Sequence, residues 1–384
     1  MKIVIAPDSF KGSLTAKQVA KAMKAGFYRI FPDAEYVMNP MADGGEGTVQ
    51  TLVDATNGQI ITHRVHNPFF EMVNSSYGML GDRQTAVIEM AAASGIQFIT
   101  PARADPLVAT TFGTGELIID ALNHGAKKII IGLGGSATID GGAGMAQALG
   151  VNLLDKDGQA IRRGGGGLAL LDHIDLSRLD PRLAKTPIVI ASDVTNPLTG
   201  PQGAARVFGP QKGASPAMIV RLDHNLQHYA HVIQRDCGRN IEQVSGAGAA
   251  GGLGAGLLAF TSAQMEHGVD VVIQATKLKA RARGAQLVLT GEGGIDFQTK
   301  FGKAPYGVAK ATNEVAPSAP VIVLAGKVGK GARELCTAGF IDAIFATPTS
   351  AKPLAQALAD APQDIAATAE NVARLLRSTL SSTK

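Results

Sequence analysis

The chain has 384 residues, of which 45% are hydrophobic and 18% are charged. Its 36 basic and 32 acidic side chains leave a formal net charge of +4, and no block of like charges indicates binding to nucleic acid or to a membrane. A chain of this length exceeds the usual size of one compact core, so we expect two domains. Neither a signal peptide nor an apolar run of about 18 residues is evident, which predicts a cytoplasmic protein.

The numbers and positions of cysteine and glycine further narrow the class of protein. Cys237 and Cys336 show no CxxC spacing, which argues against a disulfide framework and against a zinc site. The 46 glycines make up a larger fraction of the chain than the average of about 7%. They also occur in clusters. Clustered glycines predict several loops in which the backbone approaches a ligand closely.

The N-terminal segment predicts a strand, a polar loop and a helix. Residues 2–6 predict a buried strand, and the helix that follows has apolar positions at helical spacing from Ala16 to Ile30. Thr15 and Gln18 form a plausible capping box for this helix. A second, short helix is expected at 49–55, after a glycine-rich turn.

The same alternation returns near the C-terminus and predicts a parallel sheet covered by helices. The expected strands there are 287–290, 321–324 and 343–346, with a helix at 306–314. Because one N-terminal unit cannot make such a sheet alone, we expect residues 1–58 and 284–384 to form one α/β domain. Residues 59–283 then form an inserted α/β domain, with expected strands at 85–90, 128–132 and 187–191 and a long helix at 216–233. A ligand-binding cleft is expected between the two domains.

A glycine-rich loop follows the strand at 128–132 and contains Gly134, Gly135, Ser136 and Thr138. Backbone N–H groups in such a turn, before a helix, favour phosphate binding. The loop is not a Walker A motif, because GxxxxGK[ST] occurs nowhere in the chain. A second run, 246–251, fits GxGxxG, but no good strand precedes it. We therefore interpret this run as close backbone packing. A dehydrogenase function stays open, ranked third after the two alternatives given below.

Carboxylates and lysines at loop starts form a set suited to phosphoryl transfer. Carboxylates bind Mg²⁺ and one of them can accept the proton of an attacking hydroxyl, while lysines neutralise a migrating phosphate. The acidic candidates are Asp8, Asp43, Glu46, Asp193, Glu292 and Asp296, and the basic candidates are Lys11, Lys212, Lys303 and Arg206. By contrast, His224, His228 and His231 share one helix face opposite an apolar stripe, which indicates a solvated surface.

Several motif blocks follow one another along the chain in a defined order and spacing. They begin at Asp8 (DSFKG), Ala42 (ADGGEGT), Gly113 (GTGEL), Gly134 (GGSAT), Asp193 (DVTNPL), Phe208 (FGPQKGA), Gly246 (GAGAAGG) and Thr290 (TGEGGIDFQT). Read together, these blocks resemble the bacterial type-I glycerate kinase family in order and spacing, and the resemblance extends from the first strand to about Val308.

This resemblance implies transfer of the γ-phosphoryl group of ATP to D-glycerate, at the 2-hydroxyl, with Mg²⁺. It also implies a flavodoxin-like, three-layer α/β domain with a parallel sheet, a second mixed α/β domain inserted in it, and an active site in the cleft between them. Two positions depart from the family pattern: Ile139 stands where Asn is common, and Gly294 stands where Arg is common.

We assign roles to the candidate residues on these grounds. Asp193 is the expected base, and the catalytic set also includes Lys11, Lys212 and Asp8. The expected nucleotide ligands are Gly134, Gly135, Ser136, Thr138, Gly291, Glu292 and Lys303. The expected glycerate ligands are Ser9, Asn196 and Arg206, and the expected metal ligands are Asp43, Glu46 and Asp296.

Alternatives to a glycerate kinase remain open from the sequence. They are a kinase for another small hydroxy acid, and a non-catalytic regulator that binds nucleotide or glycerate and has lost turnover at Gly294. The expected partners are small molecules only, with neither nucleic acid nor membrane, and the chain is expected to be a monomer or a homodimer.

Overall fold

The computed structural model describes residues 1–101, 103–337 and 339–381. The chain divides into two compact units, and each of them is discontinuous in sequence. Unit 1 comprises Met1–Asp43, Gln50–Thr56 and Gly268–Lys384, and unit 2 comprises Gly44–Val49 and Asn57–His267. Relative to the predicted division into 1–58 with 284–384 and 59–283, unit 1 gains 268–283 and unit 2 gains 44–49 and 57–58.

Local contacts explain the two larger differences. Arg281 donates hydrogen bonds to Asn39 Oδ1 and to the Met38 carbonyl, both at 2.8 Å, so the segment 268–283 is tied to the N-terminal strands. On the other side, the Val49 N–H donates to Glu89 Oε1 at 2.8 Å, which ties 44–49 to unit 2. Side-chain contacts of this kind leave no periodic pattern in a sequence.

Unit 1 contains a five-stranded parallel sheet in the order β13-β12-β11-β1-β2. Counted along the chain, this is the 2-1-3-4-5 order of flavodoxin-like folds, so the predicted fold class is confirmed. The strand order reverses between β1 and β11, which is where such sheets bind ligands. The strands are β1 (Lys2–Ile5), β2 (Glu35–Met38), β11 (Leu287–Glu292), β12 (Val321–Ala325) and β13 (Ala343–Ala346).

Helices cover this sheet. Ile3 and Ile5 of β1 pack in one core with residues of α1 and α13, whereas Val4 is fully buried on the opposite side. The predicted capping box of Thr15 and Gln18 starts α1. The helices are α1 (Ala16–Tyr28), α9 (Gly268–Ala275), α10 (Leu278–Ala282), α11 (Ala304–Asn313), α12 (Glu334–Thr337) and α13 (Leu354–Ser381), and α2 (Thr48–Thr56) runs from unit 2 into unit 1.

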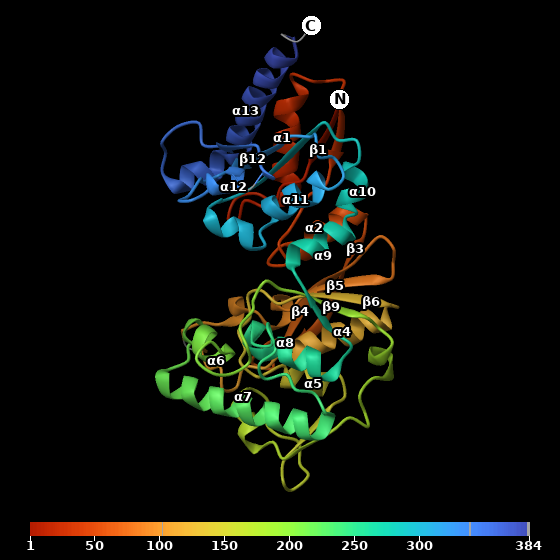
Figure 1. Cartoon of the computed structure of the whole chain (residues 1–384). Helices are drawn as coiled ribbons and strands as arrows, with labels where there is room; N and C mark the ends of the chain where they lie inside the picture. Colours follow the sequence, from red (N-terminus) through yellow and green to blue (C-terminus); the bar gives the residue numbers. More distant parts are fainter. Residues whose placement is uncertain (102, 338, 382–384) are drawn as a thin grey trace. The chain divides into compact units, whose positions relative to one another are not determined.

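Helices α1 and α13 lie side by side, although they stand at opposite ends of the sequence (Figure 1). The contact depends on Gly26 of α1. A Cβ atom at this position would stand 2.2 Å from the Ala366 carbonyl oxygen and 2.8 Å from the Ala369 Cβ atom of α13. Only a residue without a side chain permits this approach.

Unit 2 contains a six-stranded mixed sheet in the order β10-β9-β6-β5-β4-β3 and a small antiparallel pair, β7-β8. The four strands β10, β9, β6 and β5 are parallel, and β4 and β3 continue antiparallel. The strands are β3 (Gln59–His66), β4 (Met72–Met79), β5 (Thr85–Glu89), β6 (Lys128–Gly132), β7 (Asn152–Leu154), β8 (His173–Asp175), β9 (Ile188–Ala191) and β10 (Gln264–Glu266).

The helices of unit 2 surround two apolar cores, and β6 is predicted without error by the sequence. The predicted helix at 216–233 is also present and extends to Cys237. The helices are α3 (Ala91–Ser94), α4 (Phe112–Asn123), α5 (Ala143–Ala148), α6 (Ala204–Phe208), α7 (Pro216–Cys237) and α8 (Ala249–Phe260).

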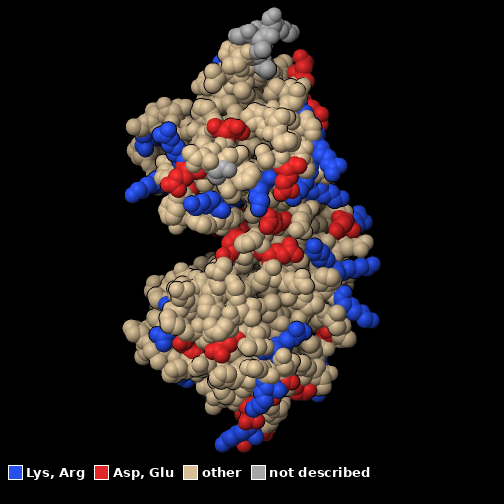
Figure 2. Space-filling view, in the orientation of Figure 1, with Lys and Arg blue, Asp and Glu red and all other residues tan. Residues whose placement is uncertain are grey.

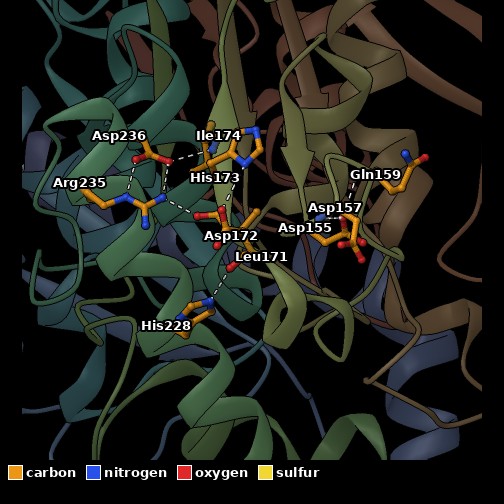
Figure 3. A network of polar contacts seen from close by, with 10 residues as sticks. All are labelled: Asp155, Asp157, Gln159, Leu171, Asp172, His173, Ile174, His228, Arg235 and Asp236. Carbon is orange, nitrogen blue, oxygen red and sulfur yellow. Dashed lines mark hydrogen bonds and ion pairs between the residues drawn. The ribbon is translucent and has the colours of Figure 1, made fainter.

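A polar network joins α7 to the segment around β8 (Figure 3). Asp236 accepts the Ile174 N–H at 2.8 Å and pairs with Arg235, and His228 Nε2 lies 2.7 Å from the Leu171 carbonyl oxygen. The three histidines of α7 are exposed, as predicted, and His228 additionally ties the helix to its neighbour. Among the described residues, no group of three or more His, Cys, Asp or Glu side chains could hold a metal ion.

The surface agrees with the weak charge imbalance of the sequence. On the face drawn in Figure 2, Lys and Arg side chains are interspersed with Asp and Glu side chains. None of the helices within 1–101, 103–337 and 339–381 has the length and apolarity needed to span a bilayer.

We predict that Gly26→Ala destabilises the protein. The added methyl group forces α1 away from α13, and overpacking of this kind costs about 1–3 kcal/mol, more than the ~1 kcal/mol that alanine gains in helix propensity. Urea unfolding should show a lower midpoint for Gly26→Ala. Ala25→Ser, on the exposed side of the same helix, should unfold like the wild type; equal midpoints for all three proteins would contradict the prediction.

Candidate active site

A cavity of about 340 Å³ opens in unit 1 beyond the carboxyl ends of β1 and β11. This is the point where the strand order reverses, which is the expected ligand site of an open parallel sheet. Six residues that the sequence singled out line it: Asp8, Ser9, Lys11, Asp43, Glu292 and Lys303. The predicted candidates from the N-terminal and C-terminal segments therefore gather in one place.

Asp8 is a deeply buried acid of this cavity, with 5% of its surface exposed. Its N–H donates to the Gly291 carbonyl at 2.8 Å, and its Oδ1 accepts the Ser9 N–H at 2.5 Å. Burial, with a further contribution from the negative charge of Asp43, raises the pKa of Asp8 to about 7. A carboxyl group with a pKa near neutrality can exchange a proton at physiological pH.

Two lysines oppose the carboxylates. Lys11 Nζ lies 3.3 Å from Asp43 Oδ2, and Lys303 Nζ lies 3.0 Å from Glu292 Oε1. Burial disfavours the charged form of Lys11, but Asp43 and Asp8 outweigh it and raise the pKa of this ammonium group. Burial raises the pKa of Glu292, and the charge of Lys303 partly offsets this effect. The cavity thus holds charges of both signs within reach of one ligand.

The loop after β11 shapes the cavity wall. Lys303 Nζ also donates to the Gly294 carbonyl at 3.1 Å. A Cβ atom at Gly294 would meet nothing within 4 Å, so a side chain can begin there without a clash. The carboxylate of Asp296 accepts the Gln298 N–H at 2.9 Å and caps the 3₁₀ helix η5 (Phe297–Phe301). Asp296 does not line the cavity, and its role as a metal ligand stays a prediction.

The glycine-rich loop lies in unit 2, after β6. Gly134 and Gly135 at its tip are exposed, whereas Ser136 and Thr138 are buried. Lys212 is 1% exposed, and its Nζ donates to Ser136 Oγ and to the Thr138 carbonyl, both at 2.7 Å. Burial lowers the pKa of Lys212 to about 7. The structure thus shows Lys212 inside the loop, where it holds the backbone; its contact with a phosphate stays a prediction.

The run at 246–251 packs against this loop, as interpreted from the sequence. A Cβ atom at Gly251 would stand 1.8 Å from the Thr138 carbonyl oxygen, and one at Gly252 would stand 2.7 Å from the Gly141 Cα atom. Both glycines have positive φ angles, of 68° and 91°. The glycines therefore serve backbone packing, and the GxGxxG match is not a dinucleotide fingerprint.

Asp193 follows β9 in unit 2 and pairs with a residue that the sequence analysis missed. His267 Nδ1 lies 3.1 Å from Asp193 Oδ1, because β10 pairs with β9 in a register that places Glu266 beside Ala191. Strand β10 has only three residues, which is too short for a hydrophobic alternation that would predict it from the sequence. A carboxylate and an imidazole in contact can accept and pass on a proton.

The other predicted ligands of unit 2 already have protein partners. Asn196 Nδ2 donates to the Gln202 carbonyl at 2.8 Å, and Arg206 Nε pairs with Asp223 Oδ2 at 3.0 Å. Glu46 lies in the turn before α2, where Glu89, which the sequence analysis missed, accepts the Val49 N–H. These contacts leave the predicted roles in substrate and metal binding untested.

Asp140, in the same glycine-rich loop, fixes the start of α5. Its Oδ2 accepts the Thr111 N–H at 2.8 Å and the Thr111 hydroxyl at 2.9 Å, and its Oδ1 accepts the Gly142 N–H at 3.1 Å. Burial raises the pKa of this carboxyl. The neighbouring Ile139, one of the two departures from the family pattern, is fully buried in an apolar core. An apolar side chain therefore suits that position.

Comparisons with known proteins agree with one another. The model of the Glycerate kinase family matches residues 3–377. The glycerate 2-kinase of Escherichia coli K12 is 51% identical, with 98% of each chain covered. The glycerate kinase of Bacillus subtilis 168 is 50% identical, also with 98% of each chain covered.

A crystal structure from Salmonella typhimurium LT2, assigned as a glycerate kinase 2, is 50% identical and covers 99% of both chains with a TM-score of 0.91. Family model, relatives and structure thus span nearly the whole chain, so this chain belongs to the Glycerate kinase family.

Proposed function

We propose that this protein is a glycerate kinase, which transfers the γ-phosphoryl group of ATP to the 2-hydroxyl of D-glycerate and releases ADP and 2-phosphoglycerate. The full-length similarity to proteins named glycerate kinase and glycerate 2-kinase supports the reaction class. The single structural observation that carries the proposal is the cavity at the strand-order reversal, where Asp8, Asp43 and Glu292 face Lys11 and Lys303.

The arrangement of charges suits phosphoryl transfer, which needs positioning and charge neutralisation more than covalent chemistry. Lys11 and Lys303 provide positive charge for the phosphates, and their ion pairs with Asp43 and Glu292 hold them in place before a ligand arrives. On binding, phosphate oxygens replace or share these carboxylate partners.

The acidic residues fit a magnesium ion that the nucleotide brings along. Mg²⁺ is commonly held by one or two carboxylates together with substrate phosphates, so the lack of a group of three or more acidic or histidine ligands among the described residues agrees with this mode. Asp43, which lines the cavity, is the leading protein ligand, and Glu46 and Asp296 stay further candidates. Bound Mg²⁺ supplies neutralisation of the phosphate charge.

We propose Asp193 as the group that accepts the proton of the glycerate hydroxyl. Its contact with His267 orients the carboxylate and offers a route by which the proton leaves. Ser9, Asn196 and Arg206 are proposed to bind the glycerate carboxylate and hydroxyls, and Gly134, Gly135, Ser136, Thr138 and Gly291 to contribute to nucleotide binding.

Two other functions stay as alternatives: a kinase for another small hydroxy acid, and a regulator that binds nucleotide or glycerate without turnover. We further propose that the protein acts in the cytoplasm, as a monomer or a homodimer, on small molecules alone.

The direct test is an assay that couples ADP release to a spectroscopic signal, with ATP, Mg²⁺ and D-glycerate, followed by ³¹P NMR of the product. We expect turnover and a resonance of 2-phosphoglycerate. A 3-phosphoglycerate resonance overturns the regiochemistry alone. Turnover with another hydroxy acid but not with glycerate overturns the substrate, and ligand binding without turnover favours the regulator.

For Asp193→Asn we expect kcat to fall by about 10²–10⁴-fold with little change in the KM values, because the amide cannot accept the proton. Steady-state kinetics at saturating ATP and glycerate measures this. Asp157→Asn, an exposed acid of the same unit, serves as the control and should retain wild-type turnover. If Asp193→Asn kept most of its kcat, Asp193 could not be the base.

For Asp8→Asn we expect a gain in stability that depends on pH. The pKa of Asp8 lies at about 7 in the folded state and near 3.8 in the unfolded state, so folding takes up a proton between these values. The wild type therefore loses stability as pH rises from about 4 to 7, and the asparagine variant does not. Its advantage in free energy of unfolding should be about 2–4 kcal/mol larger at pH 8 than at pH 4.

Urea unfolding without Mg²⁺ at these two pH values measures the difference. Asp33→Asn, which removes an exposed carboxyl from the same unit, should show no such gain. A pH-independent effect of Asp8→Asn would contradict the raised pKa.

A further inference from the structure

We propose that the apolar half of the unit 1 cavity binds the base of the nucleoside triphosphate, and that α13 supplies its wall. The inference rests on the proposed function, because it takes a nucleotide as the phosphoryl donor. The apolar wall consists of Leu354, Ala357, Leu358 and Ala361 from α13, with Pro348 beside them, and Asp364 of the same helix also lines the cavity. No motif of the sequence pointed to this helix.

The spacing of the four α13 residues shows that the wall is one helix face. They stand at positions i, i+3, i+4 and i+7, which align as a single stripe on an α-helix. Leu354 is 74% exposed, and such exposure of a leucine that lines a cavity is explained when a ligand covers it.

The volume of the cavity indicates more than glycerate. About 340 Å³ lies within the ~300–1,000 Å³ range of pockets that enclose drug-sized ligands, and a three-carbon acid leaves most of it empty. Glycerate also offers little apolar surface to cover a wall of leucine, alanine and proline. A nucleotide has both required parts, a flat aromatic base and a charged phosphate chain.

The polarity of the cavity follows the same division. Lys11, Asp43 and Lys303 lie at the strand ends, where the phosphates would bind, and the apolar stripe comes from the first two turns of α13. The base then packs on α13 while the phosphates reach the lysines.

The wall is held in place before a ligand binds. Ser13 Oγ donates to the Leu358 carbonyl at 2.6 Å, which ties the loop after β1 to α13. Lys352 Nζ lies 2.9 Å from both Asp360 Oδ2 and Asp364 Oδ2, and this pair of contacts fixes the segment that leads into the helix. A preformed wall lowers the entropic cost of binding the base.

The test separates the base from the phosphates. We expect Leu354→Asp and Leu358→Asp each to weaken the binding of Mg²⁺-ADP by about tenfold or more in titration calorimetry. The reason is that a charged carboxylate replaces the apolar side chain on which the base would pack. Binding of Mg²⁺-tripolyphosphate, which lacks a base, should change by less than about twofold. Leu375→Asp is the matched control, since Leu375 is an exposed leucine of the same helix away from the cavity.

Three results would overturn the inference: no binding of Mg²⁺-ADP to the wild type, unchanged ADP affinity in both wall variants, or an equal loss with ADP and tripolyphosphate. Leu354→Asp alone decides the test if Leu358→Asp does not fold. The glycerate assay on the wild type keeps the two proposals apart: ADP binding that depends on the wall, without turnover of glycerate, removes the proposed function and supports the inference. Turnover of glycerate together with normal ADP binding by the wall variants supports the proposed function and removes the inference.

Discussion

The parallel pairing of β1 with β11 is the constraint on which the candidate site depends. It joins residues that are about 284 positions apart, with Ile3 beside Leu287 and Ile5 beside Leu289. The pairing continues past the strands, where the Asp8 N–H donates to the Gly291 carbonyl and the Thr290 hydroxyl donates to the Ala6 carbonyl, each at 2.8 Å. Because both strands run in the same direction, their carboxyl ends bring two separate loops to one edge of the sheet.

The same pairing creates the electrostatic character of the cavity. Asp8 follows β1 and Glu292 ends the neighbouring strand β11, and both have raised pKa values because the sheet and the helices remove them from water. Burying an acid with other acids nearby costs stability, and Lys11 and Lys303 only partly offset this cost. A fold that keeps such an arrangement trades stability for a prepared binding site.

Unit 2 uses its polar residues differently. The ammonium group of Lys212 donates to the hydroxyl of Ser136 and so holds the glycine-rich loop. The close packing of Gly251 on Thr138 fixes the loop from the other side. The exposed part of the loop is its glycine tip, and a backbone of this kind binds anions through N–H groups. In unit 1 the side chains carry the charges of the site, and in unit 2 the side chains position a backbone.

The sequence by itself determined the strands β1, β5, β6, β9, β11, β12 and β13, the capping box of Thr15 and Gln18 and, through spaced motifs, the flavodoxin-like class and the family, because periodicity, caps and spaced motifs are local signals. It also predicted six polar residues that line the unit 1 cavity, since polar residues after neighbouring parallel strands meet at one edge of the sheet. Only the tertiary structure decided that Lys212 is buried, that His267 lies beside Asp193 and that α13 supplies an apolar wall. These features arise from contacts between segments far apart in the chain, and such contacts leave no pattern in a single sequence.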